Sequence, residues 1–322
     1  MIETAVIAAL IAFAANIILC PIFIPWLKRV KFGQNIREDG PKTHLEKSGT
    51  PTMGGIVIII AFAVGSLFFL GDNETGRLIV FVTLGFGAIG FLDDYIKVVK
   101  KRSLGLRALP KILLQLIVSA IFLFLLIRID EDFARIYIPF MNGEYFHLGF
   151  MFVPASIFII LGTVNGVNFT DGLDGLAAGV TALVTTFFLL VAYGFGSEIT
   201  TIAGAAAGSL LGFLLFNTYP ARVFMGDTGS LALGGFIAAV AIVLRMPLFL
   251  AIVGFIYVIE VLSVIIQVLY FKKTGGKRFF KMAPIHHHFE QLGWKETKVV
   301  SVFYIITVIL CLIGFLATGG II

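Results

Sequence analysis

The chain alternates between long apolar runs and short polar connections. The apolar runs lie near residues 4–27, 53–71, 77–95, 108–127, 151–169, 176–194, 199–216, 230–245, 247–271 and 299–318. Each run is close to the roughly 20 residues that an α-helix needs to cross a bilayer, and the ten-residue alternation typical of a transmembrane barrel is absent. The pattern predicts an all-α, polytopic integral membrane protein with about ten transmembrane helices, which we expect to form a single domain over residues 1–322.

Composition supports the same class. Hydrophobic residues make up 59% of the chain and charged residues 13%, whereas an ordinary soluble domain carries roughly a quarter charged residues. The mean hydropathy of +1.02 agrees with this reading and excludes an ordinary soluble domain.

The basic residues are distributed unevenly among the connections. Segments 28–49, 97–111, 217–229 and 272–298 hold 20 of the 24 lysines and arginines. Because connections rich in Lys and Arg stay in the cytoplasm, we expect these four segments inside and both termini outside. A net charge of +5 would suggest a nucleic-acid partner in a soluble protein. Here topology explains the charge, and we expect membrane lipid and no nucleic acid as the partner.

Segment 128–150, on the outer side, alternates apolar and polar residues around Asn142-Gly143, a pair that strongly favours a hairpin turn. We expect a small extracytoplasmic β-hairpin there, without catalytic content. A functional site would then be assembled from cytoplasmic loops and helix ends, near residues 28–52, 96–107, 170–175, 217–229 and 272–298.

Two adjacent carboxylates, Asp93 and Asp94, end the apolar run that begins near Leu78. Charges at the rim of a membrane helix must be hydrated, paired or bound to a cation, so they indicate a functional site. Asp171, Asp174 and Asp227 also lie at predicted cytoplasmic ends of spans. We therefore expect five acids from three loops to meet on one face.

The polar side chains of the segment 165–176 recur every three residues, at Asn165, Asn168, Asp171 and Asp174. On a continuous helix this spacing rotates by about 60° per step, so the four could not share one face. Three glycines in the segment allow the helix to break and leave Asp171 and Asp174 in a bent loop. A plain polar turn between two spans is the alternative reading.

Asp227 is bracketed by Gly226 and Gly229 where the next apolar run begins. Backbone N–H groups at such a helix start can hold an anion while the carboxylate takes a cation. The alternative is an ordinary N-cap formed by Asp227 or Ser230.

Three histidines, His286, His287 and His288, are consecutive in the last basic connection. Consecutive helical residues point about 100° apart, and zinc sites use spaced ligands. We prefer phosphate or sugar contacts, or a proton donor, over a solvated surface patch.

Carboxylates from several loops together with surplus Lys and Arg indicate a magnesium site for phosphate chemistry, because Mg²⁺ takes oxygen ligands and bridges carboxylates to phosphates. A site at the membrane boundary can join a soluble phosphorylated substrate to a lipid phosphate. The chain contains no Gly-x4-Gly-Lys-Ser/Thr loop, which argues against a P-loop ATPase.

The sequence resembles the polyprenyl-phosphate N-acetylhexosamine-1-phosphate transferase superfamily and, within it, the phospho-N-acetylmuramoyl-pentapeptide transferase branch. The resemblance rests on Pro51-Thr52-Met53-Gly54-Gly55, Asp93-Asp94-Tyr95-x-Lys97, Asn165-x-x-Asn168-x-Thr170-Asp171-Gly172-Leu173-Asp174-Gly175-Leu176, Met225-Gly226-Asp227-Thr228-Gly229-Ser230 and Pro284-Ile285-His286-His287-His288-Phe289-Glu290. It implies transfer of phospho-N-acetylmuramoyl-pentapeptide from its UDP carrier to undecaprenyl phosphate at the bacterial cytoplasmic membrane, with Mg²⁺ required and a homodimer left open.

The resemblance also implies roles for individual residues. Asp93, Asp94 and Asp227 would be catalytic, with Asp227 as the Mg²⁺ ligand and the pair on the lipid phosphate, and Lys97 would neutralise phosphate charge. The nucleotide-sugar side would comprise Lys47, Thr52, Asn168, Asp171, Asp174, Asn217, Phe224, Gln267 and His286, with Phe224 stacking on uracil and His287 and His288 as further substrate contacts. A lysine of the family falls at Leu109 here, and the sequence leaves open whether Lys111 or Arg107 replaces it.

Three questions stay open at this stage. A sister enzyme that transfers N-acetylglucosamine-1-phosphate to the same lipid shares the carboxylates, and a secondary transporter also uses broken helices and buried acids. Direct attack by the lipid phosphate competes with a two-step route through a phospho-aspartate. Glu260, in the middle of a predicted span, has no assigned role.

Overall fold

The computed structural model describes residues 1–30, 49–99 and 105–320. Within these ranges, nine helices are long and apolar enough to cross a membrane. They are α1 (Ile2–Arg29), α3 (Glu74–Val99), α4 (Ala108–Ile129), α5 (Phe152–Thr170), α6 (Leu176–Gly194), α7 (Thr200–Asn217), α8 (Gly226–Val243), α10 (Phe255–Lys273) and α12 (Glu296–Ala317). A tenth apolar helix, α2 (Gly55–Leu67), is shorter. The predicted all-α membrane fold is confirmed.

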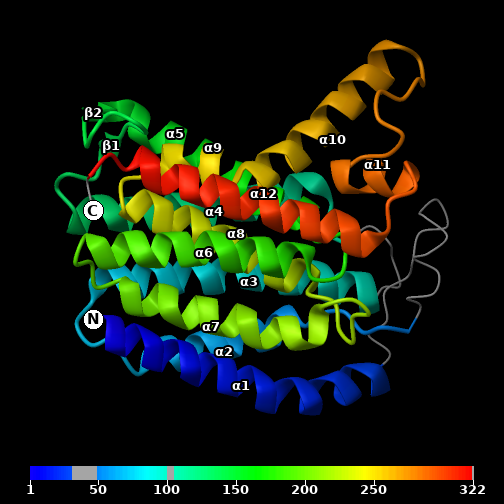
Figure 1. Ribbon diagram of the computed structural model, residues 1–322, viewed down its shortest axis with the longest axis horizontal. Coiled ribbons are helices and arrows are strands. Elements are labelled where there is room, and N and C mark those ends of the chain that lie inside the picture. Colours follow the sequence, from blue (N-terminus) through cyan, green and yellow to red (C-terminus); the bar gives the residue numbers. More distant parts are fainter. Residues whose placement is uncertain (31–48, 100–104, 321–322) are drawn as a thin grey trace.

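Helices α7 and α8 form the centre of the bundle, and 83% of the residues in their apolar stretches are buried. Helix α1 packs along α7 (Figure 1) because α7 presents glycines to it. A Cβ at Gly208 would lie 2.0 Å from the Ala9 carbonyl oxygen, and one at Gly204 would lie 2.5 Å from that of Ala5. Small residues allow such close helix packing where lipid supplies no hydrophobic drive.

The prediction of one continuous helix over 247–271 is wrong. A 3-10 turn (Pro247–Phe249) leads into the short helix α9 (Leu250–Val253), and α10 begins only after Gly254. Gly254 has φ −95° and ψ 18°, which is not helical, and it ends α9. Figure 1 shows α10 leaning away from the bundle, so its far end stands apart from the other helices.

The predicted hairpin is confirmed. Strands β1 (Arg135–Tyr137) and β2 (Tyr145–His147) pair antiparallel, with Ile136 opposite Phe146. The backbone N–H of Phe140 donates to the carbonyl of Ala317 at 2.8 Å, which ties the hairpin to the end of α12. In Figure 1 both termini and the hairpin lie at one end of the bundle, and the short helix α11 (Ile285–Gln291) lies at the other.

Candidate active site

Two carboxylates near the end of α3 and one at the start of α8 meet at one point. Asp93 and Asp94 are 2% and 3% exposed, and Asp227 is the second residue of α8. Oxygen atoms of all three lie within 4.8 Å of one another. The helices approach this closely because Gly90 has no side chain: a Cβ there would lie 2.1 Å from the Asp227 carbonyl oxygen. The structure thus joins two of the predicted loops.

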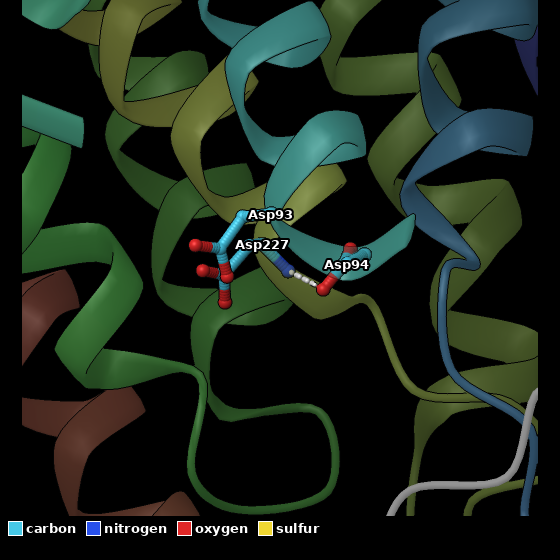
Figure 2. A group of neighbouring side chains, drawn as sticks. All are labelled: Asp93, Asp94 and Asp227. Atoms are coloured by element: carbon cyan, nitrogen blue, oxygen red, sulfur yellow. Dashed lines mark hydrogen bonds between the residues drawn. The ribbon is translucent and has the colours of Figure 1, made fainter. Parts of the chain in front are cut away.

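Asp94 binds the start of α8. Figure 2 shows the carboxylates of Asp93 and Asp227 side by side, while Asp94 turns away from them toward the Asp227 backbone N–H. Asp94 accepts hydrogen bonds from this N–H at 3.2 Å, from the Thr228 N–H at 2.9 Å and from the Thr228 hydroxyl at 2.7 Å. Free N–H groups and the helix dipole favour an anion at this position. The anion expected at this helix start is therefore the Asp94 carboxylate, and neither Asp227 nor Ser230 caps the helix.

Two lysines face the carboxylates. Lys97 Nζ lies 2.5 Å from Asp93 Oδ2 and 3.1 Å from Asp227 Oδ2. Lys111 Nζ, on α4, lies 2.6 Å from the same Asp227 oxygen. Arg107, by contrast, is exposed at the N-cap of α4. Of the two candidates that the sequence left open, Lys111 is therefore the one that contacts the acids, and its role in the reaction stays a prediction.

Asn168 and Asp171 extend the cluster from α5. Asn168 Nδ2 donates to Asp227 Oδ1 at 3.1 Å and to Ser230 Oγ at 2.9 Å. Helix α5 ends at Thr170 and α6 begins at Leu176, so the predicted break is confirmed and leaves Asp171 and Asp174 in the loop between them. Desolvation raises the pKa of Asp171 to about 8, and the charges of Asp227 and Asp94 add to this shift.

Asp174 lies deeper in the same loop. Its backbone N–H donates to Glu296 Oε1 at 2.7 Å, and its Oδ2 accepts the N–H of Ala221 at 2.9 Å. The Tyr304 hydroxyl donates to the carbonyl of Gly175 at 2.6 Å. Helix α12 therefore anchors this loop through Glu296 and Tyr304. Sequence reasoning missed Glu296, because a glutamate at a helix start is common and nothing in the local pattern marked its partner.

The carboxylate cluster fits a divalent cation. All three donor groups are oxygen, which Mg²⁺ prefers. The cluster carries three carboxylates against two ammonium groups, so it has negative charge to offer a cation. Asp93 and Asp227 are the residues that would hold the ion, since Asp94 is engaged with the backbone of α8.

Comparisons with known proteins cover the same residues. The model of Glycosyl transferase family 4 matches residues 77–245, which include all three acids. The phospho-N-acetylmuramoyl-pentapeptide-transferase signature 1 matches residues 47–59. The protein of that name from Acetivibrio thermocellus is 55% identical over 312 residues, which are 96% of this chain and 93% of that protein. The chain belongs to the phospho-N-acetylmuramoyl-pentapeptide transferase family. A second member, from Clostridium botulinum, is 53% identical over 317 residues, which are 98% of this chain and 96% of that protein.

The family signature segment borders the carboxylates. Lys47 lies outside the described residues. Thr52 is buried, and a side chain on Gly226 would lie 2.8 Å from Thr52 Oγ1 and 2.7 Å from Asp94 Oδ2. Thr52 therefore lies near Asp94, and its expected place on the nucleotide-sugar side stays a prediction.

The same segment also holds the loop before α8. The N–H of Phe224 donates to the carbonyl of Pro51, and the N–H of Gly54 donates to that of Phe224, both at 2.8 Å. Asn217 Nδ2 donates to the Val223 carbonyl at 2.9 Å. Phe224 is half-buried, so part of its ring can still meet a ligand. Asn217 shapes this loop, whereas its expected substrate contact stays a prediction.

The three histidines of the family motif lie on α11 and differ in their contacts. His286 is fully buried and pairs with Glu260, and His287 Nδ1 lies 2.7 Å from Glu290 Oε2. His288 Nδ1 accepts the N–H of Lys281 at 3.1 Å.

Gln267, expected on the nucleotide-sugar side, holds the backbone of a loop. Its Oε1 accepts the N–H groups of Phe279 and Phe280, and its Nε2 donates to the Phe280 carbonyl at 3.2 Å. Gln267 therefore shapes the connection between α10 and α11, and a substrate contact by it stays a prediction.

Lys111 and Arg107 make a matched pair for testing the basic position. We expect Lys111→Gln to lower turnover by about 10- to 100-fold, the scale typical of a group that orients and balances a ligand carboxylate. Arg107→Gln, which removes a charge of the same sign from an exposed site, should change turnover by less than about 2-fold. Initial rates of UMP release from purified variants would check this, and equal effects of the two changes would refute the assignment of Lys111.

Proposed function

We propose that this protein transfers phospho-N-acetylmuramoyl-pentapeptide from UDP-N-acetylmuramoyl-pentapeptide to undecaprenyl phosphate, yielding lipid I and UMP for peptidoglycan synthesis, and that the reaction requires Mg²⁺. The observation that carries the proposal is the meeting of Asp93, Asp94 and Asp227 between α3 and α8. Its support is the family membership, since relatives more than half identical over nearly the whole chain carry the name of this reaction.

The arrangement suits direct transfer between two phosphates. Phosphoryl transfer depends on positioning and charge neutralisation more than on covalent help. An oxygen of the lipid phosphate attacks the sugar-linked phosphorus of the pyrophosphate, a P–O bond forms, and the P–O bond to UMP breaks. A monoester phosphate is largely ionised near neutral pH, because its second pKa is about 6. The lipid phosphate therefore has little proton left for a base to remove, and Asp93 contributes by holding Lys97 and, with Asp227, the cation that would face the phosphate oxygens.

The remaining side chains balance charge around this step. Lys97 contacts both Asp93 and Asp227. Its ammonium group can therefore neutralise negative charge on the attacking phosphate and on the leaving phosphate. Lys111 and Asn168 fix the two oxygens of Asp227. Mg²⁺ held by Asp227 and Asp93 would supply further neutralisation of phosphate oxygens. Asp94 keeps α8 in register with α3 and thereby sets the separation of the other two acids.

The protein crosses the membrane several times, and we place it in the bacterial cytoplasmic membrane with this site on the cytoplasmic face. The support is the charge pattern of the sequence: 20 of the 24 Lys and Arg residues belong to the four connections predicted to be cytoplasmic, and the carboxylates come from helix ends that border these connections in the sequence. UDP-linked sugars are cytoplasmic substrates, which agrees with this orientation. A dimer is compatible with the proposal and is not needed for it, since the acids come from one chain.

An assay of UMP release tests the proposal. Purified protein with Mg²⁺, undecaprenyl phosphate and UDP-N-acetylmuramoyl-pentapeptide should release UMP and form labelled lipid product. UDP-N-acetylglucosamine should give neither, and removal of Mg²⁺ by EDTA should stop the reaction until Mg²⁺ is restored. Equal turnover of the two UDP-sugars would favour the sister transferase. Without lipid acceptor we expect no UMP, and a stoichiometric burst would favour the phospho-aspartate route.

A further inference from the structure

A buried carboxylate and a buried imidazole meet beside the candidate active site. Glu260, in α10, and His286, in α11, are both 0% exposed, and Glu260 Oε1 lies 3.0 Å from His286 Nδ1. A carboxylate buried in apolar surroundings is costly unless it is paired. The pair therefore joins the leaning helix α10 to α11, and it accounts for the acid that the sequence left unassigned.

The other nitrogen of His286 faces the loop of Asp171. A Cβ at Gly172 would lie only 2.2 Å from His286 Nε2, so the ring fits against this loop only because residue 172 is glycine. His286 Nε2 is buried and has no hydrogen-bond partner among the described residues, and the same holds for Glu260 Oε2. Buried polar atoms are nearly always hydrogen-bonded in proteins, so such an atom calls for an explanation.

We propose that Glu260 is a positioning residue of the transferase: it accepts the Nδ1–H of His286 and thereby presents Nε2 to an oxygen of the nucleotide-sugar at the Asp171–Gly172 turn. The inference rests on the proposed function for the identity of that ligand. The hydrogen bond at Nδ1 selects the orientation of the ring, as a carboxylate does for a histidine in catalytic triads. With Nδ1–H donating to Glu260, Nε2 is left to make a hydrogen bond to a sugar or phosphate group.

A purely structural role for the pair predicts a different outcome. Replacing a buried ion pair by apolar residues of similar volume is often neutral or stabilising. If the pair served only to join α10 to α11, Glu260→Leu combined with His286→Leu would keep full turnover. If Glu260 acts through His286, either change alone costs turnover and the second adds little.

Kinetics of four variants separate these readings. We expect Glu260→Gln, which keeps an acceptor oxygen and loses the charge, to lower kcat by about 10-fold. Glu260→Leu should match His286→Leu at about 100-fold, and the double variant should lie within about 2-fold of either. The KM for undecaprenyl phosphate should be unchanged throughout, since neither residue contacts the lipid side. Glu198→Gln, an exposed isosteric change in the connection before α7, is the control and should keep wild-type rates.

Nuclear magnetic resonance of ¹⁵N-histidine provides a readout that needs no turnover. The chain has five histidines, and His286→Gln assigns the signal of His286. We expect a hydrogen-bonded Nδ1–H that disappears in Glu260→Leu. An unchanged His286 signal in Glu260→Leu would overturn the inference, as would additive kinetic losses or wild-type kcat in Glu260→Gln. Absence of UMP release by the wild type would instead overturn the proposed function and leave the spectroscopic test of the pair intact.

Discussion

Replacing Asp227 by asparagine is expected to lower UMP release by about 10³-fold or more, and Asp93→Asn should have an effect of the same order. Removal of a charged group that positions a transferred phosphoryl group acts on this scale. Asp227 contacts Lys97, Lys111 and Asn168, so the loss of its charge disturbs both lysines and the asparagine at once. Initial rates at saturating Mg²⁺ and both substrates would measure the effect.

The two variants should differ in stability. Asp93→Asn leaves Lys97 paired with Asp227 and removes one of three neighbouring carboxylates, so its apparent melting temperature in detergent should stay the same or rise. Asp227→Asn removes the carboxylate that pairs with both Lys97 and Lys111, so its apparent melting temperature should fall. Asp72→Asn is the matched control, because Asp72 is an exposed acid before α3, and it should leave turnover unchanged. Full activity in both Asp93→Asn and Asp227→Asn would refute the site.

Gly90→Ala is expected to reduce both stability and turnover. A methyl group at this position would lie 2.1 Å from the Asp227 carbonyl oxygen and 2.7 Å from the Thr228 Cα. These are backbone atoms, so α3 and α8 must separate to admit it. We expect a loss of about 1–3 kcal/mol in the free energy of unfolding. We also expect turnover to fall by about 10²-fold, since a shift of about 1 Å at reacting groups costs that much.

Gly162→Ala is the matched control for this change. Gly162 lies in α5, and a Cβ there meets nothing within 4 Å. An alanine is favoured over glycine in a helix interior by about 0.5–1 kcal/mol, so this variant should be as stable as the wild type or more so, with unchanged turnover. Wild-type turnover and stability in Gly90→Ala would show that the contact between α3 and α8 does not set the geometry of the acids.

Most of the fold could be predicted because apolar length is a strong signal. The long helices follow the apolar runs, and the hairpin follows Asn142-Gly143. The break at Gly254 could not be predicted with confidence, because a glycine is tolerated inside membrane helices. At the break, a Cβ on residue 254 would lie 2.8 Å from the Leu250 carbonyl oxygen and 3.2 Å from the Tyr257 ring, so the turn between α9 and α10 is too tight for a side chain.

The sequence predicted which residues belong to the candidate site better than it predicted what each residue does. Asp93, Asp94, Asp171, Asp174 and Asp227 stood out because charges are expensive at a membrane boundary. That Asp94 binds backbone N–H groups of α8 could not be predicted, because this task depends on which helix packs against α3. Lys111 and Glu260 needed the structure for the same reason: their partners lie on other helices, far away in the sequence.

The hydrogen bonds between Asp94 and the start of α8 also have a consequence for synthesis and membrane insertion of the chain. Asp94 and Thr228 are 134 residues apart, with α4, α5, α6 and α7 between them. Helices of membrane proteins are inserted first and associate afterwards. A nascent chain in which only α3 has been inserted therefore still lacks the N–H groups of α8 that hold Asp94. We therefore expect a chain that ends before α8 to lack transferase activity, because it lacks both Asp227 and the N–H groups that hold Asp94.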